Sequence, residues 1–222
     1  MCLNIIEMSE KNFVSLKDET IRIFDNAFLD WCSRIHWTFP LMVWVPVVLF
    51  SLWKAIFEFE FSILMTIAMF FVGVFIWTFS EYMMHRFVFH YHPTSAFGKK
   101  IHFLMHGIHH DYPNDSKRLV MPPLMSALLS IPFFALFYYG FGGQGATFAA
   151  FAGLVTGYLA YDMLHYAVHH AQWKNTYFEN LKKQHMAHHY VHPDQVFGVS
   201  STFWDIIFGT TLEKARQQRD AN

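Results

Sequence analysis

The chain has 222 residues, of which 54% are hydrophobic, 19% are aromatic and only 15% are charged. Soluble domains carry about 25% charged residues, so this composition indicates a protein that sits in lipid and excludes a disordered chain. The net charge of -1 with histidine neutral offers no basic surface for nucleic acid. Histidine is the second anomaly, because its 15 residues nearly equal the 16 lysines and arginines combined.

The N-terminal segment, residues 1–38, is predicted to be a helical segment on the cytoplasmic face or at the membrane interface. Apolar residues recur at helical spacing between charged ones, at Ile21, Phe24, Phe28 and Trp31. This spacing predicts an amphipathic interfacial helix over residues 18–37, with a core helix of a cytoplasmic cap as the alternative. No apolar stretch resembling a secretory signal opens the chain, so insertion is expected to rely on internal segments.

Residues 39–222 are predicted to form one domain, since no linker rich in glycine, serine or proline divides them. Four apolar stretches approach the roughly 20 residues needed to cross the hydrocarbon core of a bilayer. They are Phe39–Phe57, Phe61–Ser80, Pro122–Phe141 and Ala146–Leu164. Short connections within each pair make two helical hairpins. The predicted fold is therefore an all-α integral membrane protein with four transmembrane helices and a helical cap.

The lysines and arginines predict the orientation of these spans. All of them except Lys54 lie before the first span, between the second and third, or after the fourth. The positive-inside rule then places both termini and the cap in the cytoplasm. Lys54 lies near the end of a span, where its long side chain is expected to snorkel toward water. Arg118 is expected to meet a lipid headgroup or the anionic lipid surface.

Ten histidines recur in motifs on that same predicted face. They are His85, His90, His106, His109, His110, His165, His169, His185, His188 and His189. The pattern His-x-x-His-His occurs twice, at residues 106–110 and 185–189. Random order of this composition would produce about 0.07 copies per chain by a simple count of template matches. The two copies are therefore not an accident of composition.

The spacing of these histidines predicts a pair of metal sites. Residues i, i+3 and i+4 share a helix face, so each triplet presents at least two imidazoles to one point and can offer the third to a neighbouring point. His85 and His90 are about 140° apart on an ideal helix. They are expected to serve different metals or to lie across a distorted turn. Two metal ions with about five histidine ligands each account for all ten. The isolated histidines are not expected to be ligands: His36, His92, His102, His170 and His192.

All-imidazole ligands suit zinc, iron, copper or nickel. Redox iron acting on dioxygen explains why such a site would face lipid chains, because acid and base side chains alone cannot attack an unactivated C–H bond. Such a site supports hydroxylation of a lipid chain. Desaturation of an acyl or sterol-type lipid at the same kind of site is the alternative reaction. A metal transporter or storage protein is disfavoured, because transport ligands lie at the bilayer midplane and these spans are nearly free of ionisable residues.

Two further residues are candidates for a catalytic role. Asp162 lies three residues before His165 on the same helical face, near the membrane end, where a charge is costly unless it is paired. It is expected to accept a hydrogen bond from an imidazole N–H, with a simple interfacial anion as the alternative. Tyr161 is expected to line the substrate entrance, although an aromatic-belt tyrosine is the commoner role.

The histidine motifs and their neighbours resemble the fatty acid hydroxylase superfamily, most closely the membrane fatty acid 2-hydroxylases of sphingolipid acyl chains. The resemblance covers about residues 75 to 210. Its specific motifs are His85-Arg86-Phe87-Val88-Phe89-His90, His102-Phe103-Leu104-Met105-His106-Gly107-Ile108-His109-His110, Arg118-Leu119-Val120-Met121-Pro122-Pro123, Gly157-Tyr158-Leu159-Ala160-Tyr161-Asp162-Met163-Leu164-His165-Tyr166, His185-Met186-Ala187-His188-His189-Tyr190 and Phe197-Gly198-Val199-Ser200-Ser201 before Trp204-Asp205.

The resemblance implies four transmembrane helices under a cytoplasmic cap and a dimetal centre, functionally di-iron, bound by the ten histidines. It also implies hydroxylation of a membrane lipid, with O2 as co-substrate, at the carbon next to the acyl carbonyl. Zinc can occupy such a site in place of iron. Eukaryotic members carry a cytochrome b5 domain with a His-Pro-Gly-Gly motif, which residues 1–38 lack. Electrons are therefore expected from a separate cytochrome b5-like or ferredoxin-like protein.

Overall fold

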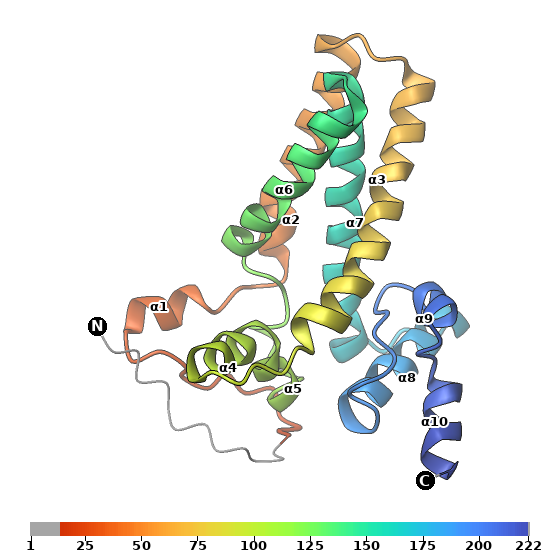
Figure 1. Cartoon of the computed structure of the whole chain (residues 1–222). Coiled ribbons are helices and arrows are strands. Elements are labelled where there is room, and N and C mark those ends of the chain that lie inside the picture. Colours follow the sequence, from red (N-terminus) through yellow and green to blue (C-terminus); the bar gives the residue numbers. More distant parts are fainter. Residues whose placement is uncertain (1–13, 222) are drawn as a thin grey trace. The chain divides into compact units, whose positions relative to one another are not determined.

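The computed structural model describes residues 14–221, and the regular elements in that range are all helices. Four helical stretches are long and apolar enough to cross a membrane: Thr38–Glu58, Ile63–Phe89, Pro123–Phe141 and Gln144–His170. They correspond to α2 (Thr38–Trp53) with η1 (Lys54–Glu58), α3 (Ile63–Met84) with η2 (His85–Phe89), α6 (Pro123–Phe141) and α7 (Gln144–His170). Figure 1 labels the four α-helices. The prediction of an all-α protein with four transmembrane helices is confirmed.

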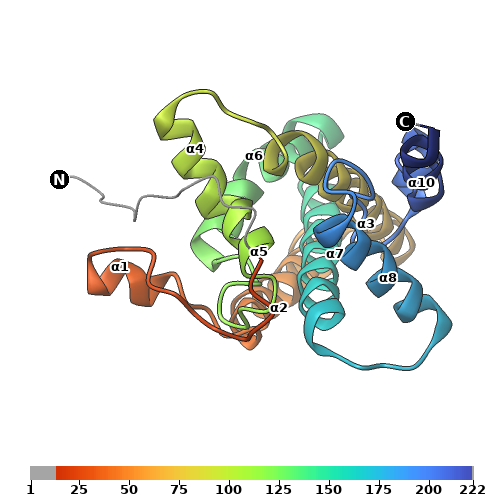
Figure 2. The ribbon, with the colours of Figure 1, turned by 90° about the horizontal axis from the view of Figure 1, so that it is seen from below.

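The remaining helices are shorter than these four stretches. They are α1 (Ala27–Cys32), α4 (Ala96–His102), η3 (Phe103–Gly107), α5 (Ile108–Asp111), α8 (Thr176–Tyr190), α9 (Phe203–Phe208) and α10 (Leu212–Ala221). The chain divides into two compact units. Residues 38–81 and 121–163 form what we call the membrane unit. The described residues of 14–37, 82–120 and 164–221 form the histidine unit, whose short helices are seen from below in Figure 2.

Two of the four long helices continue past the predicted end of their span. The second was expected to end at Ser80 and the fourth at Leu164, where the nearly unbroken apolar stretches end, but they extend to Phe89 and His170. Backbone hydrogen bonds propagate a helix whether or not its side chains are apolar. The extensions carry three of the ten motif histidines, His85, His165 and His169.

Close packing of α3 against α7 organises the membrane unit. A Cβ atom built on Gly73 would lie 1.9 Å from the carbonyl oxygen of Ala150, and one on Gly153 would lie 1.8 Å from that of Phe70. The two backbones are therefore in direct contact, as small residues allow between membrane helices. In its most apolar window α7 is 72% buried, whereas the windows of the other three long helices are at most 22% buried. Helix α7 is thus the central helix of this unit.

The predicted amphipathic helix over residues 18–37 is wrong, because only α1 forms there and the described residues before it are not helical. Side chains take the backbone donors that a longer helix would use. The Asn26 side chain accepts hydrogen bonds from the first turn of α1, and the Asp30 carboxylate accepts one from the backbone N–H of Ile23 at 2.8 Å. Ile21 and Phe24 pack beside a buried cluster of Ile23, Phe103 and Ile108 in the histidine unit, instead of facing lipid.

The expectation that Arg118 meets lipid headgroups is also wrong. Its side chain is 5% exposed and lies 3.2 Å from the Asp30 carboxylate and 3.3 Å from the Asp115 carboxylate. It also donates a hydrogen bond of 2.6 Å to the carbonyl oxygen of Ile21. A buried guanidinium needs such partners to offset its desolvation. Arg118 therefore joins the segment around Ile21, before α1, to the connection that follows α5.

Candidate metal centre

The ten motif histidines gather into two groups of five within the histidine unit. The first histidine group is His85, His90, His106, His110 and His188, and the second histidine group is His109, His165, His169, His185 and His189. One ring nitrogen of each member lies within 4.8 Å of the corresponding atoms of its group. Each group could hold one metal ion.

Helical spacing explains how each triplet is shared between the groups. His106 and His110, one helical turn apart, belong to the first group, whereas His109 between them belongs to the second. The second triplet mirrors this division, because the i and i+4 members join the second group and His188 joins the first. A residue at i+3 lies about 60° from the one at i, enough to direct its imidazole to a neighbouring point.

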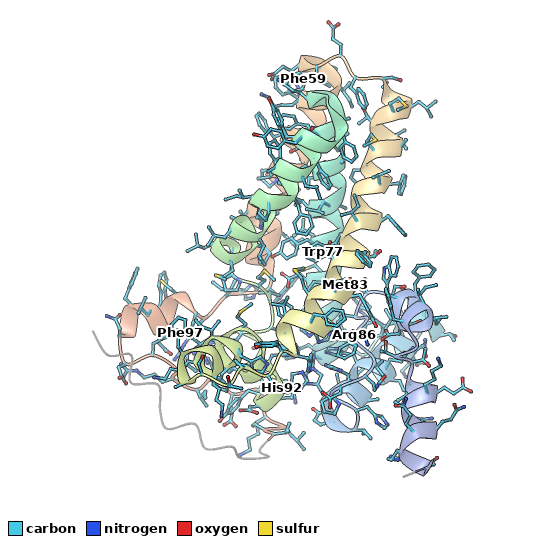
Figure 3. The ribbon with its side chains drawn as sticks, in the orientation of Figure 1. Phe59, Trp77, Met83, Arg86, His92 and Phe97 are labelled. Atoms are coloured by element: carbon cyan, nitrogen blue, oxygen red, sulfur yellow. The ribbon has the colours of Figure 1, made fainter. Side chains whose placement is uncertain are left out.

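A π-helical turn brings His85 and His90 into the same group. Their ring centroids are 5.0 Å apart. The turn is η2, in which the backbone N–H of His90 donates a hydrogen bond of 3.2 Å to the carbonyl oxygen of His85, five residues earlier. Of the two alternatives left by the sequence, the distorted turn is the one observed. Such π turns occur frequently at functional sites, and Figure 3 labels Arg86 within this one.

The nitrogen separations fit a bound cation better than hydrogen bonds between rings. The Nε2 atom of His106 lies 3.2 Å from that of His85, 3.1 Å from that of His90 and 2.9 Å from that of His110. A neutral imidazole nitrogen carries either one proton or one lone pair, so it cannot satisfy three such neighbours. Ligands held about 2.0–2.1 Å from a metal at right angles lie about 2.9 Å apart.

The second histidine group has the same close spacing. The Nε2 atom of His185 lies 2.9 Å from that of His169 and 3.0 Å from that of His189. The Nε2 atoms of His165 and His109 are 2.9 Å apart. Both groups therefore present convergent nitrogen donors of the kind that iron and zinc accept.

Burial keeps these imidazoles neutral, as metal ligands must be. Burial is the main cause that lowers the pKa of His188 to about 4. Burial and the neighbouring imidazoles lower the pKa of His90 and of His110 to about 2. The Nε2 atom of His188 is buried and has no hydrogen-bond partner, although its Nδ1 atom has one. A metal ion would supply the missing partner.

Metal-stripped protein is expected to lose stability as the pH falls below about 6.5. The pKa of His188 is about 4 in the folded chain, against an ordinary value of 6.5. Between these two pKa values only the unfolded state takes up the proton. The contribution of neutral His188 to stability is therefore fully present above pH 6.5 and is lost as the pH falls toward about 4. The unfolding temperature in detergent should be lower at about pH 5.5 than at about pH 7.5; an equal or higher value would contradict this prediction.

The two groups differ in what holds the other side of each ring. In the first group, Nδ1 of His85 lies 2.6 Å from the carbonyl oxygen of Phe197, and Nδ1 of His188 lies 2.7 Å from that of Gln195. In the second group, four members have a buried Nδ1 atom without a hydrogen-bond partner: His109, His169, His185 and His189. Sequence reasoning missed the carbonyl partners, because a backbone acceptor leaves no mark on residue type. Only the motif around Phe197 and Asp205 pointed to this region.

The two candidate catalytic residues outside the histidine motifs lie in the membrane unit. Asp162 is 1% exposed, and it accepts hydrogen bonds from the backbone N–H of Met121 at 3.1 Å and the hydroxyl of Tyr158 at 3.3 Å. Tyr161 is buried as well, with its ring centroid 5.8 Å from that of Trp77, which Figure 3 labels on α3. The roles expected for Asp162 toward an imidazole and for Tyr161 toward substrate stay predictions.

The five isolated histidines lie outside both groups in the described part of the chain. His92, labelled in Figure 3, is 80% exposed in its side chain, and its Nε2 atom lies 4.0 Å from the Asp194 carboxylate. That the isolated histidines are not ligands stays a prediction.

Comparison with known proteins supplies a family. The model of the fatty acid hydroxylase family matches residues 70–210. The chain is 38% identical to dihydroceramide fatty acyl 2-hydroxylase FAH1 of Arabidopsis thaliana, over 85% of this chain and 79% of that protein. It is 39% identical to the ceramide very long chain fatty acid hydroxylase SCS7 of Saccharomyces cerevisiae, over 86% of this chain and 49% of that protein.

Two further comparisons agree. The chain is 34% identical to the fatty acid 2-hydroxylase of Homo sapiens, over 87% of this chain and 58% of that protein. A solved structure of full-length scs7p, in which only the hydroxylase domain is visible, is 38% identical and superposes with a TM-score of 0.81. That match covers 86% of this chain and 72% of the solved one.

Proposed function

Because the chain belongs to the fatty acid hydroxylase family, we propose that it hydroxylates the 2-position of a lipid acyl chain, in a fatty acid or a ceramide-type sphingolipid. The family and the four apolar helices make it a membrane enzyme that hydroxylates fatty acids. The 2-position is proposed because the relatives named above include 2-hydroxylases of fatty acids and dihydroceramide.

The reaction centre in this proposal is a pair of metal ions, one in each histidine group. The observation that carries it is the convergence of two sets of five imidazoles. The ten histidines act as neutral ligands. Iron is the proposed functional metal, because redox iron with O2 supplies the oxidising chemistry that a C–H bond requires; zinc fits the same ligands. Asp162 and Tyr161 are the proposed catalytic residues outside the ligand set. Asp162 is proposed to accept a hydrogen bond from an imidazole N–H, and Tyr161 is proposed to line the substrate entrance.

The orientation and the electron supply complete the proposal. Lysines and arginines lie outside both hairpin turns, which supports a cytoplasmic location for the termini and the histidine unit. Hydroxylation with O2 consumes two electrons from outside the substrate. A separate cytochrome b5-like or ferredoxin-like protein is the proposed donor, and it would deliver them from the cytoplasm.

Lipid analysis of cells that express the chain tests the proposed reaction. In a host without 2-hydroxylated lipids, mass spectrometry should detect 2-hydroxy acyl chains with the wild-type protein and none with His188→Ala, which removes a ligand of the first group. His92→Ala is the matched control, because His92 is exposed and outside both groups, and it should retain the product. Unsaturated products without a hydroxyl group would refute the hydroxylase and indicate a desaturase.

A further inference from the structure

We propose that Asp205 is a positioning residue for the first metal site, although it contacts no metal ligand. It fixes a loop, Gln195–Gly198, whose carbonyl oxygens orient two histidines of the first histidine group. We call this loop the carbonyl clamp. The inference rests on the proposed metal-binding role of the two groups and goes beyond it, because it predicts that a residue outside the ligand set controls the release rate of only one of the two ions.

The carbonyl clamp reaches the first group at two points. The Phe197 carbonyl oxygen lies 2.6 Å from Nδ1 of His85, and the Gln195 carbonyl oxygen lies 2.7 Å from Nδ1 of His188. A carbonyl can only accept, so each Nδ1 must carry the ring proton and each Nε2 keeps its lone pair. Such bonds fix both the tautomer and the orientation of a ligand imidazole. One short loop therefore sets two of the five ligands.

Asp205 holds the clamp through both of its carboxylate oxygens. The backbone N–H of Phe197 donates to Oδ1 at 2.9 Å, and that of Gly198 donates to Oδ2 at 2.9 Å. Asp205 itself is 0% exposed. The carboxylate therefore binds the N–H of the same residue, Phe197, whose carbonyl oxygen faces His85. Movement of Asp205 would move that carbonyl directly.

Thr210 supports the same arrangement from a second direction. Its hydroxyl donates to Oδ1 of Asp205 at 2.7 Å, and its carbonyl oxygen accepts from the backbone N–H of Val196 at 2.9 Å. The Tyr82 hydroxyl lies 2.9 Å from the Thr210 hydroxyl. Because the Thr210 proton points to the carboxylate, Tyr82 is the donor in this pair. A chain of hydrogen bonds thus runs from α3 to Asp205.

The backbone of the clamp would not adopt this shape unaided. Val196 has a φ of 61°, in the left-handed region that β-branched residues strongly avoid. Gly198 has no room for a side chain, since a Cβ there would lie 2.1 Å from the Ser201 carbonyl oxygen and 2.7 Å from Oδ2 of Asp205. Strained conformations persist where their surroundings over-determine them. Asp205 and Thr210 provide that surrounding structure.

The effect should be confined to one ion, because both histidines that the clamp carbonyls contact, His85 and His188, belong to the first group. A residue needed only for folding would affect both ions alike. The test uses the full chain, purified in detergent and loaded with Zn²⁺, and it follows the transfer of zinc to a chelator. Wild type, Asp205→Ala and Asp205→Asn are compared. Asp220→Asn is the matched control, because that side chain is 71% exposed.

Wild-type protein should bind two zinc ions per chain. In Asp205→Ala, one of the two should leave about 10-fold faster or more, at the low end of the effect of lost outer-shell partners, while the other leaves at the wild-type rate. Asp205→Asn should be intermediate, because an amide offers one acceptor oxygen for two N–H donors. The affected ion is assigned with ligand variants. Each ligand variant is combined with Asp205→Ala. The remaining ion should still leave fast when His189→Ala has removed the second ion, and no fast ion should remain when His90→Ala has removed the first.

Thr210 keeps the test decisive if Asp205→Ala does not fold. Thr210→Val should accelerate loss of the same single ion, whereas Thr210→Ser keeps the hydroxyl and should restore the wild-type rate. Equal acceleration of both ions, or no acceleration in any variant, would overturn the role of Asp205 and leave the metal centre intact. Fewer than two zinc ions in the wild-type protein would overturn the metal centre itself, and the inference with it.

Discussion

Alanine at His188 is expected to remove one metal ion and alanine at His189 the other, although the two residues are adjacent in the chain. His188 belongs to the first histidine group and His189 to the second. Both side chains are at least nine-tenths buried, so solvent cannot replace the lost ligand freely. Each single variant should therefore contain one ion per chain, and the double variant should contain none.

Elemental analysis of protein purified in detergent measures this result. Hydroxylation should fall on the order of 100-fold or more in each single variant, because the loss of outer-shell partners alone commonly costs 10–100-fold. His192→Ala is a close control, since His192 lies just after α8, the helix that carries His188 and His189, but outside both groups. It should keep two ions and its activity. Loss of both ions from either single variant, or of neither, would contradict the division into two groups.

The second large effect is expected in the membrane unit, where a methyl group at Gly73 or Gly153 should prevent α3 and α7 from packing. The added Cβ would lie 1.9 Å or 1.8 Å from a backbone carbonyl oxygen, which cannot rotate away as a side chain can. The helices must separate, and the neighbouring contacts along α7 are lost with them. Gly153→Ala should destabilise the fold by at least about 3 kcal/mol, the upper end of ordinary overpacking.

The thermal unfolding midpoint in detergent measures this loss, together with the fraction of protein that remains monodisperse after heating. Gly140→Ala supplies the control, because a Cβ on Gly140, in α6, meets nothing within 4 Å. This second substitution also replaces glycine with alanine within a membrane helix, so it isolates the collision from the change in helix propensity. Similar midpoints for the two variants would refute the close contact.

The sequence predicted those features that depend on residue type and helical period. Hydropathy located all four long helices, and the i, i+4 spacing anticipated that His165 would stand with His169. Hydropathy could not predict where the helices of the second and fourth spans end, because their last turns mix charged residues and histidines with apolar ones. Nor could it pair Gly73 with Ala150, since only the packed helices bring them together.

The failures share a physical cause, which is the capture of backbone groups by distant or irregular partners. The apolar period over residues 18–37 suggested a helix, but Asp30 binds the backbone N–H of Ile23 and Arg118 binds the carbonyl of Ile21. The sequence left two alternatives open for His85 and His90, because the π turn that joins them depends on a one-residue shift of hydrogen bonding that no residue pattern specifies. The carbonyl clamp acts through main-chain atoms, which every residue possesses.

The exchange of one histidine between the two triplets makes each bound ion a cross-link between remote stretches of sequence. In the first group, four ligands come from residues 85–110 and the fifth is His188; in the second, four come from residues 165–189 and the fifth is His109. Neither half of the chain can complete a site alone. Metal loading would therefore fasten the halves to each other twice, and an enzyme cut between its two hairpins would have to reassemble before it could retain either ion.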